Sequence, residues 1–142
     1  MAWIARGIKW IMLVSGVLTF TMIYAALAPD AALRSTFGES IDGPVANIVV
    51  RNWGALIALV GAMLVYGAFR PAVRPMALAV AGLSKVVFIG LILASGRQFL
   101  GPQLLVSIVA DGVMVVLFAA FLLAPAPSGD TSPFARGSSP AP

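Results

Sequence analysis

Four long apolar stretches dominate the sequence, and the segments outside them hold most of the prolines and charges. The four stretches cover residues 10–28, 44–69, 76–95 and 102–124. An α-helix needs about 20 apolar residues to cross a hydrocarbon core of about 30 Å, because it rises ~1.5 Å per residue. The pattern therefore predicts an all-α, polytopic membrane protein, an antiparallel bundle of four transmembrane helices.

Glycine and proline mark the boundaries of these helices. Gly43-Pro44 precedes the second stretch and Gly101-Pro102 the fourth. Proline at the first helical position loses only an N–H that has no partner within the helix anyway. Arg70-Pro71 follows the second stretch, and proline cannot continue a helix. These signals predict the starts of the second and fourth helices and the end of the second.

The first stretch has some features of a signal peptide. It follows basic residues, and Ala26-Leu27-Ala28 resembles a cleavage site. However, the apolar run is longer than the roughly 7–15 residues of a secretory core, and cleavage would place Pro29 at the new N-terminus. We therefore expect a first helix that is retained.

The two longest segments outside the four stretches are 29–43 and 125–142. In the connection 29–43, Asp30 is a candidate N-cap, Leu33 and Phe37 share a face, and Gly38 is a candidate C-cap. This predicts a helix of one to two turns at the membrane surface, between the first two membrane helices. The segment 125–142 is rich in Pro, Ser and Gly, which predicts a disordered tail.

Composition supports the bilayer as the main partner of the chain. Charged residues make up only 10% of the sequence, whereas a globular domain carries roughly 25% to cover its core. The sequence contains no Cys and no His, which excludes disulfides, thiolate chemistry and His-ligated haem. Since it also lacks phosphate-binding loops and catalytic triads, we expect no cofactor, no bound metal and no conventional catalytic residues.

The distribution of charge predicts the orientation of the bundle. The nine basic residues are scattered and form no patch for nucleic acid. With the N-terminus inside, five basic residues near helix ends lie inside and three outside: Arg6, Lys9, Arg70, Arg74 and Arg136 against Arg34, Arg51 and Arg97. Basic residues favour the cytoplasmic side. We therefore expect both termini, and the tail, in the cytoplasm.

Two ionisable residues lie well inside apolar stretches. Lys85 is ten residues from Ser95, about 15 Å, and Asp111 is nine residues from Pro102, about 13 Å. The third and fourth helices are joined by a short loop, so they should be antiparallel neighbours with these charges at one level. Each charge alone costs roughly 2.5–3.5 kcal/mol at a helix centre. The sequence therefore predicts a Lys85–Asp111 ion pair.

Arg51 and Asn52 form a second polar point, about two turns into the second helix. Arg51 either lies at the outer interface, with Trp53 as an aromatic anchor, or points inward to Asp111. Small residues at Gly54, Ala58 and Ala62 follow on its face and favour the inward position. The predicted polar cluster is open to the outer side of the membrane and draws on all four helices: Arg51, Asn52, Lys85, Ser107, Asp111 and Thr19.

Two interpretations of this cluster stay open. The ion pair neutralises itself and only fixes the register of the helices, or the cluster binds an anionic head group, a lipid or a small polar ligand, or relays a proton. Two further small-residue motifs, Gly54-x-x-x-Ala58 and Gly90-x-x-x-Ala94, predict helix packing.

Residues 50–56 and 81–88, followed by Asp111, resemble a family of small bacterial four-helix membrane proteins. That family carries a domain of unknown function, and some of its members are labelled phage infection proteins. The resemblance covers roughly residues 5–124. It implies a bundle in the bacterial inner membrane with Arg51, Asn52, Lys85 and Asp111 as the polar signature, and it implies no activity or substrate.

The sequence favours a non-enzymatic membrane component with an accessory, assembly or receptor-like role, because it has short loops, small-residue stripes and no catalytic motif. The alternative is a small transporter or carrier that binds a polar or anionic ligand at the buried cluster. Four helices enclose little volume, so we expect a carrier to work as a homo-oligomer or within a larger membrane complex. A lipid-modifying enzyme using Lys85 and Asp111 is the weakest alternative.

Overall fold

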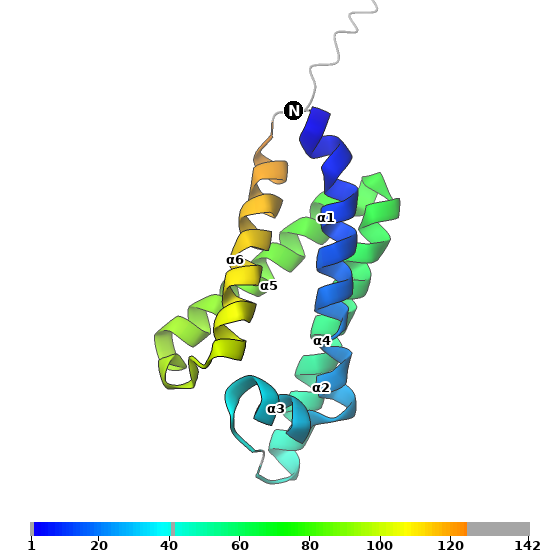
Figure 1. Ribbon diagram of the computed structural model, residues 1–142. Coiled ribbons are helices and arrows are strands. Elements are labelled where there is room, and N and C mark those ends of the chain that lie inside the picture. The colour runs from blue at the N-terminus through cyan, green and yellow to red at the C-terminus, as the bar shows by residue number, and fades with distance from the viewer. Residues whose placement is uncertain (1, 41, 125–142) are drawn as a thin grey trace, which may run out of the picture.

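The computed structural model describes residues 2–40 and 42–124, so the predicted tail 125–142 lies outside the described residues. The described chain is helical (Figure 1). Its elements, with two short 3-10 turns, are α1 (Ala2–Phe20), α2 (Ile23–Leu27), α3 (Pro29–Phe37), α4 (Pro44–Phe69), η1 (Pro71–Val73), α5 (Arg74–Ser95), η2 (Arg97–Phe99) and α6 (Pro102–Leu123).

Four helical segments are long and apolar enough to cross a membrane, with mean hydropathies between 1.9 and 2.5: Gly7–Leu27, Pro44–Phe69, Pro71–Ser95 and Pro102–Leu123. Their outward faces carry large apolar side chains such as Leu59, Leu83 and Val106, each more than 60% exposed. Water-soluble proteins rarely expose apolar surface on this scale. The predicted all-α fold with four membrane-spanning helices is confirmed.

The first membrane span differs from the prediction because it is interrupted at Thr21 and Met22. The Thr21 hydroxyl donates a hydrogen bond of 2.5 Å to the Leu18 carbonyl. The N–H groups of Met22, Tyr24 and Ala25 each donate to the carbonyl three residues earlier. Such bonds tighten the backbone into a 3-10 turn, and this turn separates α1 from α2.

The short helix in the connection is present as α3, with nine residues. Gly38 adopts a left-handed φ of 73°, and its N–H donates to the Arg34 carbonyl at 3.1 Å, so it is the C-cap that the sequence predicts. The predicted N-cap is wrong, because Pro29 already occupies the first helical position and Asp30 follows it. Asp30 instead forms an ion pair of 3.0 Å with Arg34, one turn further along.

The helices form two antiparallel hairpins, and residues 2 and 124 lie at the same end of the bundle (Figure 1). In the first hairpin, α1 and α2 lie along α4. A Cβ atom on Gly54 would lie 2.6 Å from the Ala26 nitrogen, and one on Gly61 would lie 2.5 Å from the Phe20 nitrogen. The two backbones are therefore in direct contact. In the second hairpin, α5 lies beside α6.

The buried stripe on α4 consists of Gly54, Ala58 and Gly61, whereas the predicted member Ala62 is exposed. A step of seven residues returns to nearly the same helical face, but a step of eight turns about 80° away from it. The second predicted motif does not pack within the described chain, since Gly90 and Ala94 are exposed and no atom lies within 4 Å of a Cβ built on Gly90.

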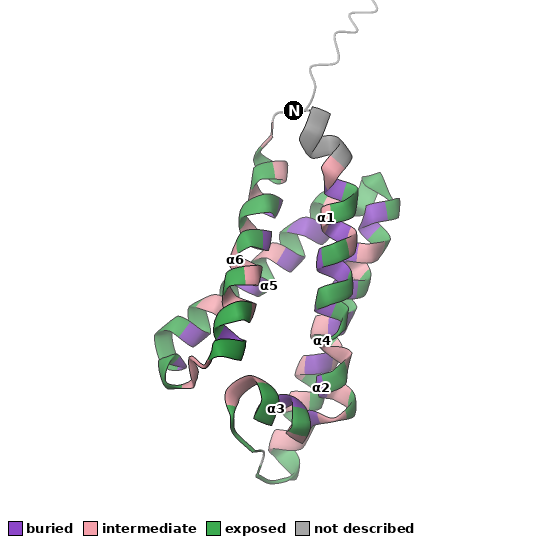
Figure 2. Ribbon diagram, viewed as in Figure 1, coloured by how far each residue is buried: buried purple, intermediate pink, exposed green. Residues whose placement is uncertain are grey.

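The apolar core joins the two hairpins at the end where the termini lie. It is contributed by all four long helices: Ile8, Met12, Leu64, Ala68, Ala77, Leu78, Ala81, Met114 and Phe118. Figure 2 shows the buried positions on the facing sides of the helices in this half. Toward the α3 end the hairpins diverge (Figure 1), and the candidate site lies between them there.

Replacing Gly61 by Ala tests the contact between α1 and α4. The added methyl group would meet the backbone at Gly16 and Phe20 rather than a mobile side chain. We expect a loss of about 1–3 kcal/mol in the free energy of unfolding, as for other overpacked positions. Thermal unfolding in detergent measures it. Gly90→Ala is the matched control and should keep or raise stability, by up to about 1 kcal/mol. Equal stability of the two variants would contradict the contact.

Candidate functional site

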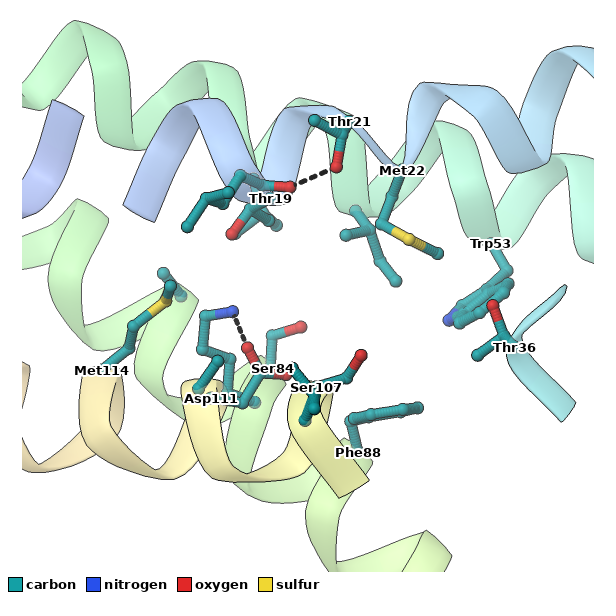
Figure 3. Close-up of a pocket in the computed structure, with 17 residues that line it drawn as sticks. Thr19, Thr21, Met22, Thr36, Trp53, Ser84, Phe88, Ser107, Asp111 and Met114 are labelled. Carbon is teal, nitrogen blue, oxygen red and sulfur yellow. Dashed lines mark hydrogen bonds and ion pairs between the residues drawn. The ribbon is translucent and has the colours of Figure 1, made fainter. Parts of the chain in front are cut away.

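A cavity of about 280 Å³ lies between the two hairpins, next to the apolar core. Ala81 and Met114 belong to the core and also line the cavity. Ligand pockets typically measure about 300–1,000 Å³, so this volume suits a head group or a small molecule. Polar side chains of three helices line it: Thr19 of α1, Ser84 and Lys85 of α5, and Ser107 and Asp111 of α6. Thr19, Ser84, Ser107 and Asp111 are labelled in Figure 3.

The predicted ion pair between Lys85 and Asp111 is present, and it forms part of the cavity wall. The Lys85 ammonium donates to Oδ1 of Asp111 (Figure 3). The side chains are only 10% and 20% exposed, respectively. An ammonium has three donors and a carboxylate about four acceptor sites. Since the structure gives each of these residues no other side-chain partner within the described chain, the pair keeps hydrogen-bonding capacity for a ligand.

Thr19 faces this pair from the other hairpin (Figure 3). Its side chain is buried, with 7% exposure, and its hydroxyl oxygen has no hydrogen-bond partner among the described residues. A buried hydroxyl without a partner costs roughly 1–3 kcal/mol. A polar group that enters the cavity from outside the chain would remove this cost. Thr19 is therefore the strongest sign that the cavity accommodates a polar ligand.

Ser107 and Met22 complete the polar and adaptable part of the wall. The Ser107 hydroxyl donates to the Gln103 carbonyl at 3.2 Å within α6, and its oxygen remains an acceptor. Met22 lies in the interruption of the first span and lines the cavity beside Thr19. The turn at Thr21 and Met22 therefore shapes the site. Little in the sequence signals this turn, since neither proline nor glycine marks it.

Arg51 does not point to Asp111, so this part of the predicted cluster is wrong. Its Nε donates to Asn47 Oδ1 at 2.8 Å, and its Nη1 donates to the Ala26 carbonyl at 2.7 Å. Ala26 lies in the last turn of α2, where carbonyl groups lack partners within the helix. Arg51 thus binds the C-terminal end of α2. It lies on the bundle-facing side of α4, but that side faces α2 and not α6.

Asn52 is also outside the cavity, because it is exposed on α4 and does not line the cavity wall. Of the six residues predicted to form the cluster, the structure brings four together around the cavity: Thr19, Lys85, Ser107 and Asp111. The charges of Lys85 and Asp111 cancel, and among the described residues no other charged side chain lines the wall. The site therefore carries no net charge.

The α3 helix lies at the open end of the cavity and contacts both hairpins. The ring of Phe37 lies 6.4 Å from that of Trp53 on α4 and 6.2 Å, edge-on, from that of Phe99 in η2, measured between ring centroids. Thr36 and Trp53 line the cavity (Figure 3). Spacing within the sequence did not reveal this arrangement, since the three rings come from three separate segments.

No protein-family model, curated protein or solved structure matches this chain. The function therefore has to be argued from the cavity and its residues.

Substitutions at the ion pair test its structural role. We expect Lys85→Met and Asp111→Leu each to leave an uncompensated buried charge and to lose about 3–5 kcal/mol of stability, as found for buried pairs. The double variant Lys85→Met/Asp111→Leu should recover most of that loss, because no charge remains. Thermal unfolding in detergent measures all three. If the double variant is no more stable than the less stable of the two single variants, the pairing is contradicted.

Proposed function

We propose that this chain is a multi-pass membrane protein that binds a small polar ligand or head group in the cavity beside Lys85 and Asp111, as a receptor or carrier and not as an enzyme. The observation that carries the proposal is the buried Thr19 hydroxyl, which has no partner among the described residues and faces a buried ion pair across the cavity. A pair that served only to fix helix register would need neither a cavity beside it nor a buried hydroxyl at the cavity wall.

The absence of His and Cys supports a binding role over catalysis. Lys85 and Asp111 neutralise each other in a direct ion pair. An accessory or assembly role is compatible with the same cavity, since a bound ligand can regulate contacts with a partner protein.

A cavity-filling substitution tests the binding role. In Ser107→Trp, the indole would occupy the cavity without changing its charge. Leu105→Trp is the matched control, because Leu105 lies on the same helix, is 48% exposed and lines no part of the cavity. Each protein is purified in mild detergent, and the small molecules that remain bound are measured by mass spectrometry. We expect a compound present in wild type and control to fall about tenfold in Ser107→Trp, a loss of roughly 1.4 kcal/mol in binding.

Identical small-molecule profiles in all three proteins would overturn the proposed binding site. The unfolding temperature of Ser107→Trp is measured in parallel, so that a loss of ligand is not confused with a loss of fold. If Ser107→Trp proves unstable, Ser84→Phe fills the cavity from α5 and supplies the same comparison.

We place the protein in the bacterial inner membrane with both termini in the cytoplasm. The end of the bundle with the termini carries Lys9, Arg70 and Arg74, and the opposite end carries α3 with Asp30 and the acidic connection. Basic residues favour the cytoplasmic side. Lys9 also lies over the Phe69 ring at 4.9 Å, which ties α1 to α4 at this end.

Reporter fusions test the orientation. A fluorescent protein fused after Ala124 should fluoresce, whereas alkaline phosphatase, which needs disulfides formed in the periplasm, should be inactive there. Alkaline phosphatase inserted after Gly38 should be active. The opposite pattern of phosphatase activity would place the termini outside and contradict the orientation.

A further inference from the structure

An apolar groove lies between α1 and α6 on the side of the bundle that faces lipid. Its volume is about 470 Å³. Its wall is apolar apart from Ser15, with four residues from each helix: Trp10, Ile11, Val14 and Ser15, and Ala110, Val113, Met114 and Leu117. Val14 and Val113 are more than half exposed, and α1 and α6 are both membrane-spanning. The groove therefore opens toward the hydrocarbon chains of the bilayer.

The groove adjoins the polar cavity. Ala110 and Met114 line both spaces, one on each side of Asp111 along α6. Ala110 has the smallest side chain that a non-glycine residue can offer, and methionine is flexible enough to fit irregular shapes. A molecule with its head group beside Asp111 could thus extend an apolar chain past these two residues into the groove.

The charge of the site limits the head group. The charges of Lys85 and Asp111 cancel. Arg51 adds no charge to the cavity, because its guanidinium group donates to the Ala26 carbonyl. An anion or a cation would bring an uncompensated charge into a low-dielectric space, which is costly. A hydroxyl group would instead accept from Lys85 or donate to Asp111, and a carbonyl group would accept from Lys85 or Thr19, in each case without adding charge.

From these observations we infer that the ligand is an uncharged amphiphile of the bilayer. Its hydroxyl- or carbonyl-bearing head group binds at Lys85, Asp111 and Thr19, and its single apolar chain lies in the groove between α1 and α6. This inference rests on the proposed binding function and adds the chemical class of the ligand and its route. The molecule reaches the cavity sideways from the membrane, while α3 and its aromatic contacts cover the aqueous end.

Photolabelling in phosphatidylcholine vesicles tests the ligand class and the route. The probe is a monoacylglycerol with a diazirine in its acyl chain, and labelled residues are mapped by mass spectrometry. We expect the probe to label the groove residues. An excess of unlabelled monoacylglycerol should reduce that labelling about tenfold. A sulfate monoester with the same diazirine chain is permanently anionic and should label the groove about tenfold less.

Val113→Trp blocks the groove without entering the cavity, since Val113 lines only the groove. Val116→Trp is the matched control, because Val116 is 67% exposed on the same helix and lines neither space. We expect groove labelling to be lost in Val113→Trp and kept in Val116→Trp. Val14→Trp blocks the same groove from α1 and provides a second test if Val113→Trp fails to fold.

Uniform labelling of lipid-facing residues, with no change in Val113→Trp, would overturn the lateral route. Equal or stronger labelling by the sulfate probe would overturn the uncharged head group. Protection by glycerol added to the water would show that the site is reached from the aqueous side. If Ser107→Trp loses its bound compound while Val113→Trp keeps it and its labelling, the binding site stands and this inference fails.

Discussion

The backbone contact between α4 and the first span is the constraint on which the rest of the structure depends. Lipid chains are as apolar as leucine, so membrane helices associate largely through close packing. Gly54 and Gly61 allow that approach, because a Cβ at either position would collide with the backbone of the first span. The first span therefore packs against α4 along most of its length. The second hairpin then packs against the first through the core near the termini, and α3 contacts both hairpins at the opposite end. The diverging ends leave the cavity between the hairpins.

The ion pair determines how the second hairpin can sit. Lys85 and Asp111 are neighbours on antiparallel helices, and sliding α5 against α6 by one turn would separate the charges by about 5.4 Å. Each charge would then lie alone in a low-dielectric interior. The pair also lies at the border between core and cavity, since Ala81 and Met114 are each within one turn of it. The same interaction therefore fixes the register of α5 and α6 and places a polar wall beside Thr19.

The four spans and the ion pair could be predicted because both follow from counting residues along single helices or across one short loop. The partner of Arg51 could not. A stripe of small residues shows which face of a helix is buried, but not which neighbour it faces. The prediction that Ala62 is buried was wrong for a related reason. Ala62 is eight residues after Gly54, and a step of eight residues leaves the helical face that Gly54 and Gly61 share. The interruption at Thr21 and Met22 depends on a hydroxyl bonding its own backbone, which many threonines inside helices do not do.

The position of Arg51 is explained by the end of the first span. The last carbonyl groups of a helix have no partners within it, and such groups are costly away from water. Arg51 donates to the Ala26 carbonyl where α2 ends. Arg74 binds the carbonyls of Gly67 and Ala68 at the end of α4, and Arg97 binds that of Leu93 near the end of α5. Three arginines thus stabilise three helix ends. Because Arg51 is used in this way, the cavity keeps only the charges of Lys85 and Asp111, and a site that the sequence suggested for anions is suited to an uncharged polar group.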